Sequence, residues 1–194
     1  MDYYGFIANG YNELHREEQL NKLIIIKNNI NIKKDKKMLD VGCGTGISSG
    51  FECFAVGIDP SIGLLRQNKN DKKLLGAAEM LPFKSNSFDY VISVTSIHNF
   101  NNIKKSIDEM KRVGRQNFVF SVLKKSKKFN TIKNLIEKNF KIWKMIEEGK
   151  DTIFFCQKSK IFEHARKSFC DLPTCQKPLK SAVWHDYLLF LIIT

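Results

Sequence analysis

The chain has 194 residues, of which 43% are hydrophobic and 27% are charged, a balance that predicts one globular, soluble domain with a full core. Its longest apolar run, Tyr187–Ile193, is far too short to cross a bilayer, and the first residues lack the basic start and apolar core of a signal peptide. The composition therefore excludes a membrane-spanning protein and predicts a cytoplasmic one.

The net charge of +12 raises nucleic acid as a partner. The basic residues are mainly lysine, with only five arginines, and asparagine and isoleucine are abundant as well. An AT-rich genome would produce this excess of Lys, Asn and Ile without any selection for binding RNA. The charge alone therefore leaves both interpretations open.

The five cysteines are odd in number and irregularly spaced, which predicts reduced thiols in a cytosolic protein. Cys170 and Cys175 form a C-x4-C pair with His164 nearby. That spacing is poor for a metal site and no second pair exists, so we expect no metal.

The first predicted element is a helix within Tyr3–Asn29, because apolar residues recur there near helical spacing, at Leu14, Leu20, Leu23 and Ile24. A polar, lysine-rich turn follows. Next comes Met38–Gly46, which reads M-L-D-V-G-C-G-T-G and begins with an apolar run typical of a buried parallel strand.

Glycines at every second position, Gly42, Gly44 and Gly46, follow that strand. They leave out side chains where the backbone must turn sharply and let a ligand approach. Ile47-Ser48-Ser49 can open a short helix whose free N–H groups and positive end face the ligand. This predicts a nucleotide-type loop, although the third glycine comes one position too early for the dinucleotide fingerprint G-x-G-x-x-G.

A second short apolar run, Phe54–Ile58, ends in Asp59, which lies 59 − 46 = 13 positions past the last glycine. An acid at the end of the second strand can accept hydrogen bonds from both hydroxyls of a ribose, as in related α/β nucleotide sites.

The rest of the chain alternates between predicted strands and helices. Ser61 can cap a helix from Ile62 to about Asn68. Strands are expected at Leu74–Ala77, Phe88–Thr95 and Asn117–Leu123, helices at Ile103–Val113 and Phe129–Asn139, and a closing hairpin at Phe140–Ile146 and Thr152–Cys156.

Two polar side chains mark the carboxyl end of the strand Phe88–Thr95, the edge at which open α/β sheets bind ligands. Ser93 reaches that edge, and His98 follows it as the one imidazole near the expected reaction centre. His98 is a candidate general base for an O- or N-methylation. Alternatively, it orders its loop or lines the acceptor pocket.

Three segments together carry a resemblance to a known family: L-D-V-G-C-G-T-G, G-I-D-P-S, and A-E-M-L-P-F-K-S-N-S-F-D-Y-V-I-S. They resemble the class I S-adenosylmethionine (SAM) dependent methyltransferases, within them the type 11 group that includes the ubiquinone/menaquinone methyltransferases. The opening F-I-A-N-G-Y-N-E-L-H-R-E-E-Q is similar to small archaeal members. The match runs from about Tyr3 to Gln157.

The resemblance implies roles for individual residues. Asp40 would help order the glycine loop near the methionine end of SAM, and Asp59 with Pro60 would meet the ribose. An aromatic from the first helix can approach SAM; Tyr11 is the candidate, although it could equally pack on the sheet. The adenine would lie at Ala78, Glu79 and Met80. Many members have Asp-Ala-Glu there, whereas this chain has Ala77-Ala78-Glu79, so the adenine contact moves to Glu79.

The implied fold is a doubly wound α/β sheet of seven mostly parallel strands ending in an antiparallel hairpin. The domain would occupy residues 1–157, and residues 158–194 would form an atypical extension. The resemblance implies methyl transfer from SAM to a small-molecule acceptor. One alternative is RNA, including tRNA, favoured by the charge and by Lys124–Lys128, K-K-S-K-K, at the active-site edge. The other is a protein that binds SAM without turnover.

Overall fold

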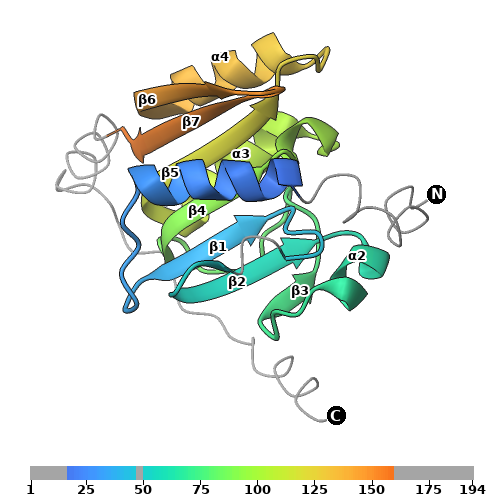
Figure 1. Cartoon of the computed structure of the whole chain (residues 1–194). Helices are drawn as coiled ribbons and strands as arrows, with labels where there is room; N and C mark the ends of the chain where they lie inside the picture. The colour runs from blue at the N-terminus through green and yellow to red at the C-terminus, as the bar shows by residue number, and fades with distance from the viewer. Residues whose placement is uncertain (1–16, 47–49, 160–194) are drawn as a thin grey trace, which may run out of the picture. The chain divides into compact units, whose positions relative to one another are not determined.

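A seven-stranded sheet forms the centre of the molecule in the computed structural model, which describes residues 17–46 and 50–159 (Figure 1). The strand order is β3-β2-β1-β4-β5-β7-β6. The strands are β1 (Lys37–Val41), β2 (Phe54–Asp59), β3 (Lys73–Leu75), β4 (Phe88–Val94), β5 (Gly114–Leu123), β6 (Phe140–Glu148) and β7 (Asp151–Lys158). The predicted seven-stranded architecture is confirmed.

The five strands from β3 to β5 pair in parallel, whereas β7 runs antiparallel to both β5 and β6. The β6–β7 hairpin turns at Gly149, whose φ of 45° lies in the left-handed region that glycine adopts without steric cost. The terminal antiparallel hairpin is therefore confirmed as well.

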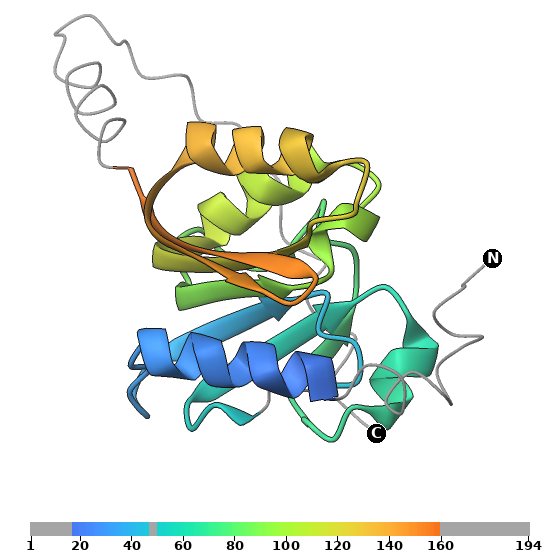
Figure 2. The same ribbon diagram turned by 45° about the horizontal axis from the view of Figure 1, so that its top comes forward.

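Helices cover both faces of this sheet (Figure 2). The helix of residues 17–29 lies on one face, and α3 (Ile103–Val113) and α4 (Phe129–Asn139) lie on the other. The short α2 (Ile62–Gln67) lies beside β2 and β3, and the 3₁₀ turn η2 (Ile97–Asn99) follows β4. Ser61 caps α2, as predicted, by accepting a hydrogen bond from the Leu64 N–H.

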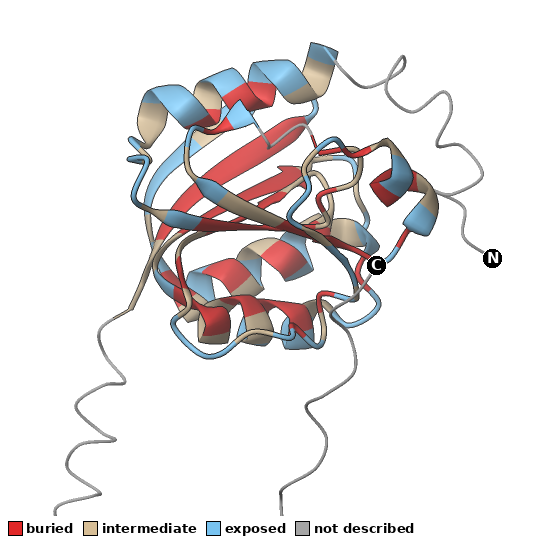
Figure 3. Cartoon of the chain, turned by 90° about the horizontal axis from the view of Figure 1, so that it is seen from below, coloured by how far each residue is buried: buried red, intermediate tan, exposed pale blue. Residues whose placement is uncertain are grey.

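Each face of the sheet has its own core, and the buried residues concentrate on the strands and on the inner sides of the helices (Figure 3). Ile107, Met110, Ile132 and Ile136 of α3 and α4 pack with β4, β5 and β7. On the opposite face Leu23 and Ile26 pack against Met38, Ile92 and Phe155. Because strands between two helical layers are buried on both sides, they read as continuous apolar runs in the sequence.

Several element boundaries differ from the expected ones by one to three residues, and the differences at β5 and β3 illustrate this. β5 begins at Gly114 rather than at Asn117. A Cβ at Gly114 would lie 2.5 Å from the Phe118 ring, so the glycine admits this aromatic side chain beside the strand. The third strand is shorter than expected and ends at Leu75.

Three of the predictions fall outside the described residues. Tyr11, the helix opening at Ile47, and all but the first two residues of the predicted extension 158–194 belong to the segments that the structure does not describe. Within the described part, no helix is long and apolar enough to cross a membrane.

Candidate functional site

The glycine loop lies where the strand order reverses, between the carboxyl ends of β1 and β4. From β1 the chain proceeds outward to β2 and β3, then returns to β4 on the other side of β1. This reversal between β1 and β4 is the position where doubly wound sheets bind ligands.

All three glycines of the loop have positive φ angles: 78° at Gly42, 50° at Gly44 and 83° at Gly46. At Gly42 a Cβ would also lie 2.5 Å from the Cβ of Ser96, and at Gly46 it would collide with the Asn68 side chain. Both the backbone conformation and the close neighbours therefore require glycine, as the spacing of the motif predicted. The left-handed loop forms a cradle that a nucleotide-type ligand can approach closely.

The Asp59 carboxylate holds this cradle from the end of β2. Its Oδ2 accepts a hydrogen bond from the Gly44 N–H at 2.9 Å, and its Oδ1 accepts one from the Ser61 N–H at 2.8 Å. Asp59 therefore orders the glycine loop, and its role toward a ribose stays a prediction.

Asp40 is buried within β1, beside Gly57 of β2 and Ile92 of β4. The neighbouring Cys43 thiol is also buried. Burial, with the charges of Asp40 and Asp59, raises its pKa far above the ordinary value. The thiol therefore stays protonated and is no nucleophile. Asp40 precedes the glycine loop by one residue, Val41, and its role toward SAM stays a prediction.

The predicted adenine turn combines one buried and one exposed apolar side chain. Ala78 is buried, whereas Met80 is 76% exposed, which leaves its thioether available to cover a planar ligand. Glu79 is half-buried, and its Oε1 accepts a hydrogen bond from the Asn102 N–H at 3.0 Å, at the start of α3. Glu79 therefore ties this turn to α3.

Ser93 is fully buried, and its hydroxyl lies 2.7 Å from that of Ser96. The Ser96 hydroxyl in turn donates to the Val41 carbonyl at 2.9 Å. Together the two serines hold the carboxyl end of β4 against the start of the glycine loop. The Ser93 side chain thus supports the glycine loop through Ser96.

His98 lies in η2, just beyond β4, and is half-buried. Burial lowers its pKa; the negative charge of Asp151 opposes this shift, and the positive charges of Lys128 and Lys22 add to it. Its buried Nδ1 has no hydrogen-bond partner among the described residues. A neutral imidazole can accept a proton, the state that a general base requires. His98 could alternatively orient an acceptor.

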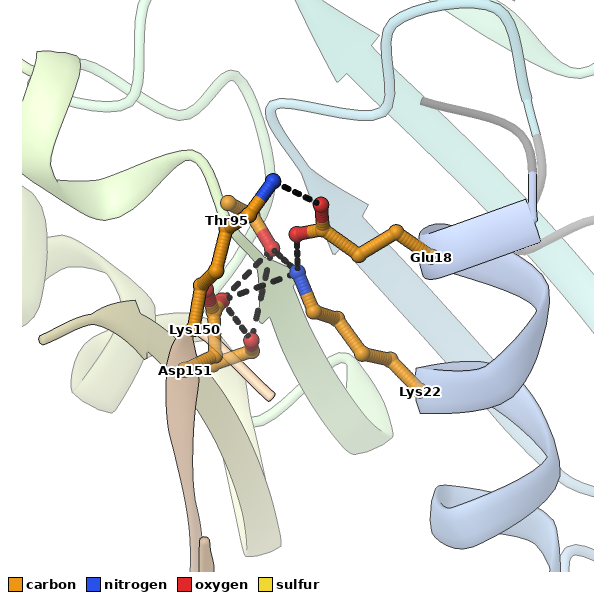
Figure 4. Close-up of polar contacts among 6 residues, drawn as sticks. Glu18, Lys22, Thr95, Lys150 and Asp151 are labelled. Carbon is orange, nitrogen blue, oxygen red and sulfur yellow. Dashed lines mark hydrogen bonds and ion pairs between the residues drawn. The ribbon is translucent and has the colours of Figure 1, made fainter. Parts of the chain in front are cut away.

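A buried polar cluster that the sequence analysis missed lies at the same edge of the sheet (Figure 4). The Lys22 ammonium, fully buried, contacts Glu18 at 2.6 Å, Thr95 at 2.9 Å and the Asp151 carboxylate at 3.2 Å. Three segments that are distant in sequence meet there: the helix of residues 17–29, the end of β4 and the start of β7. No local motif could have indicated this meeting.

Asn68 is the second residue that sequence reasoning missed. It is buried at the end of α2, and its Nδ2 donates to the Gly44 carbonyl at 3.2 Å. It therefore supports the glycine loop at Gly44, whereas Ser96 supports it at Gly42. Its only sequence signal was its place at the end of a predicted helix, which says nothing of a contact with the loop.

The described residues contain no group of three or more His, Cys, Asp or Glu side chains arranged to hold a metal ion. Cys170, Cys175 and His164 lie outside those residues.

Comparison with known proteins finds similarity to a family of methyltransferases over part of the chain. Residues 39–122 match the family model described as "Methyltransferase domain". The chain is 34% identical over 148 residues to the uncharacterized protein MJ1252 of Methanocaldococcus jannaschii, covering 72% of this chain and 58% of that protein. It is 39% identical over 86 residues to the demethylmenaquinone methyltransferase of Renibacterium salmoninarum, covering 40% of this chain and 36% of that enzyme. The chain thus spans less than two thirds of either relative.

Among solved structures, the fold is similar to that of a SAM-dependent methyltransferase from Aquifex aeolicus, with a TM-score of 0.60 at 16% sequence identity. The similarity covers 71% of this chain and 89% of that one. At this identity the likeness concerns the fold, and it agrees with the strand order and the terminal hairpin described above.

Proposed function

We propose, from the premise that this chain belongs to the class I SAM-dependent methyltransferases of the type 11 group, that it transfers the methyl group of SAM to a small-molecule acceptor. The observation that carries the proposal is the glycine cradle at the sheet's switch point, held by the Asp59 carboxylate. The residues present fit SAM: a left-handed loop for close approach, a carboxylate for the ribose, and an exposed Met80 beside the adenine turn.

SAM supplies a methyl group already activated by the positive sulfonium. The protein's task is therefore to align an acceptor with that methyl and to exclude water. In this proposal Gly42, Gly44 and Gly46 shape the loop and Asp59 holds the ribose. Glu79 and Met80 border the adenine. His98, whose pKa burial lowers, would take a proton from an O–H or N–H acceptor.

The distribution of the lysines supports a small acceptor over RNA. Exposed lysines pair with acids on several elements rather than form one stripe: Lys34 with Glu52 before β2, Lys104 with Asp108 on α3, and Lys133 with Glu137 on α4. In the K-K-S-K-K loop, Lys124 pairs with Glu147 and Lys128 donates to the His98 carbonyl. Such dispersed and partnered charge is typical of a solvated surface.

RNA is the second candidate, because Lys125 and Lys127 of the same loop are exposed close to the carboxyl edge of β5. A protein that contacts phosphates through these lysines would bind RNA with a marked dependence on salt. Mixing the protein with methyl-labelled SAM and either total RNA or a small-metabolite pool separates the two. Label in the RNA fraction, lost on substituting Lys125 and Lys127, would favour RNA. Label in neither pool, with intact SAM binding, would favour a SAM-binding protein without turnover.

The first test is SAM binding by calorimetry, comparing wild type with Asp59→Ala. Loss of a hydrogen bond to a charged group should weaken binding by about 1.5–3 kcal/mol. Because Asp59 also holds the loop, Asp59→Asn, which keeps one acceptor oxygen, should retain part of the affinity.

Asp89 provides a matched control. It is also a carboxylate at a strand end that accepts a backbone N–H, from Lys37 at 2.9 Å, but it lies at the start of β4, on the opposite edge. Asp89→Ala should leave SAM affinity unchanged. Equal losses in Asp59→Ala and Asp89→Ala would indicate general loosening, and absence of binding by the wild type would contradict the proposed function.

A further inference from the structure

The polar contacts of the Lys22 ammonium restrict the orientation of the side chains around it (Figure 4). The Lys22 ammonium donates hydrogen bonds to Glu18 and Thr95, and it forms an ion pair with the Asp151 carboxylate at 3.2 Å. The hydroxyls of Thr95 and Ser121 both donate to Asp151 Oδ2, at 2.8 and 2.5 Å. Thr95 thus receives a hydrogen bond from Lys22 and passes one to Asp151, so its orientation is determined from both sides.

The charges of this cluster balance. Glu18 and Asp151 face Lys22 and Lys150, so two carboxylates meet two ammonium groups. Burial acts to raise the pKa of Glu18, but hydrogen bonds from Lys22 and Lys150 prevail and lower it. Buried ion pairs are weak evidence for stability, because desolvation offsets much of the attraction, so their position needs another explanation.

That explanation lies in Thr95, whose hydroxyl is hydrogen-bonded to both Lys22 and Asp151. Thr95 has a φ of 52°, a left-handed conformation that is a genuine outlier for a β-branched residue. Such strain persists only where the surroundings impose it, and it concentrates at functional sites. Here Lys22 and Asp151 hold the Thr95 hydroxyl, and the Thr95 N–H donates to the Ser121 carbonyl at 3.1 Å.

The strained turn leads directly to the candidate site. Ser96, the next residue, is the neighbour that leaves no room for a Cβ at Gly42, and its hydroxyl bonds to the Val41 carbonyl. His98 follows two residues later in η2. The same turn therefore contains Thr95, which Lys22 contacts, Ser96, which packs against the glycine loop, and His98, the candidate base.

We propose that Lys22 and Asp151 are positioning residues, which hold the turn from Thr95 to His98 so that the glycine loop and the imidazole keep the geometry needed for methyl transfer. This inference rests on the proposed function for its catalytic meaning. The pair acts through Thr95 and Ser96 and touches neither SAM nor the acceptor in this assignment.

The decisive variant is Lys22→Met/Asp151→Leu, in the full chain. Replacing a buried ion pair by apolar residues of similar volume often leaves the fold intact, so this variant separates folding from positioning. We expect it to unfold cooperatively while SAM affinity, measured by calorimetry, falls about 2- to 30-fold, the range for residues that act through neighbours. Wild-type affinity in the folded double variant would overturn the proposal.

Amide hydrogen exchange provides a readout that does not depend on SAM. The amides of Ser96, His98 and Asn99 should exchange faster in the double variant, because the turn loses its hold. Unchanged protection there would overturn the inference even if the wild type bound no SAM, a result that would by itself contradict only the proposed function. Lys34→Met, which removes an exposed lysine paired with Glu52, is the control and should change neither affinity nor exchange.

Asp151→Asn provides a milder test should the double variant fail to fold. Asp151 Oδ1 has no partner among the described residues, so an amide nitrogen can occupy that place while the remaining oxygen keeps its contacts. The charged groups that act on His98 are Asp151 of β7, Lys22 of the helix, and Lys128 before α4. By NMR titration, Asp151→Asn should lower the pKa of His98 and Lys22→Met should raise it. A His98 titration that moves with neither substitution would overturn the proposed link between the pair and the turn.

Discussion

The glycine loop and the Lys22–Asp151 cluster lie at the same edge of one sheet, yet they are assembled from different ranges of sequence. The three glycines and Asp59 lie within 18 consecutive positions, 42 to 59. Ser96 and Asn68, from outside this segment, contact the loop at Gly42 and Gly46. The cluster joins Lys22 to Thr95, 73 positions away, and Thr95 to Asp151, a further 56. The first is a local motif, and the second exists only when the whole domain has folded.

This difference has an energetic side. In the glycine loop, the absence of side chains avoids steric clashes. A substitution that adds a Cβ is therefore the change most expected to destabilise the loop. In the Lys22–Asp151 cluster, charged groups are buried away from water and compensate each other's charge. Removal of one of these groups is therefore the change most expected to destabilise the cluster. Substitutions in the two regions should therefore fail in different ways.

The largest effect should come from Asp151→Ala. Removing one member of a buried ion pair leaves the Lys22 ammonium undercompensated and should lower the free energy of unfolding by about 3–5 kcal/mol. Urea denaturation measures this loss. Asp108→Ala, in the exposed Lys104–Asp108 pair on α3, should cost only about 0–1 kcal/mol. Similar losses in both variants would contradict the distinction between buried and exposed pairs.

The next effect should come from Gly46→Ala, which tests the loop. The left-handed backbone alone should cost an alanine about 1–2 kcal/mol, and the collision with Asn68 adds to this. Gly149→Ala is the matched control, since Gly149 also has positive φ but nothing lies within 4 Å of its added Cβ. Urea denaturation should show the larger loss for Gly46→Ala, and calorimetry should show weakened SAM binding only there. Equal losses for both would argue against crowding in the loop.

A smaller effect is expected at Asn102, which caps α3 by accepting a hydrogen bond from the Lys105 N–H at 3.0 Å. Asn102→Ala should cost about 1 kcal/mol in thermal or urea unfolding, and Asn102→Ser should restore most of it. Glu79 bonds to the backbone N–H of Asn102, which both variants keep, so SAM affinity should not change. A marked fall in affinity would show that the cap and the adenine turn are more tightly coupled than their contacts suggest.

The smallest effect concerns the pH dependence of stability through His98. Burial lowers the pKa of this imidazole below its ordinary value of 6.5, so the unfolded chain binds the proton more readily than the folded one. Stability contributed by neutral His98 is therefore present above about pH 6.5 and decreases as the pH falls toward the lowered folded-state pKa.

Urea unfolding of wild type and His98→Gln between about pH 7.5 and pH 5.5 isolates this contribution, because other histidines affect both proteins alike. The carboxyls of Glu18 and Glu109, whose pKa values are lowered in the fold, become protonated only at more acidic pH. The wild type should lose more stability than His98→Gln over this window. Parallel losses would show that His98 titrates as freely as in the unfolded chain.

Several parts of the fold and site were predictable because the relevant physics is local. Apolar strand segments that alternate with amphipathic helices along the chain predicted the seven-stranded sheet. The positive φ angles at Gly42, Gly44 and Gly46 confirm the sharp backbone turn that the glycine spacing indicated. The cap at Ser61 followed from its position before an apolar helix. The roles of Asp40, Asp59 and Glu79 toward SAM remain predictions.

The sequence by itself determined the alternation of strands and helices along the chain, the glycine loop and the acid that holds it, since each depends on residues a few positions apart. Only the tertiary structure decided that Lys22 would be buried against Asp151 and that Asn68 would support Gly44. A lysine in an amphipathic helix normally faces water, and nothing local distinguishes Lys22 from its exposed neighbours. Its burial depends on Thr95 and Asp151 arriving from distant strands to compensate its charge, a condition that only the folded domain meets.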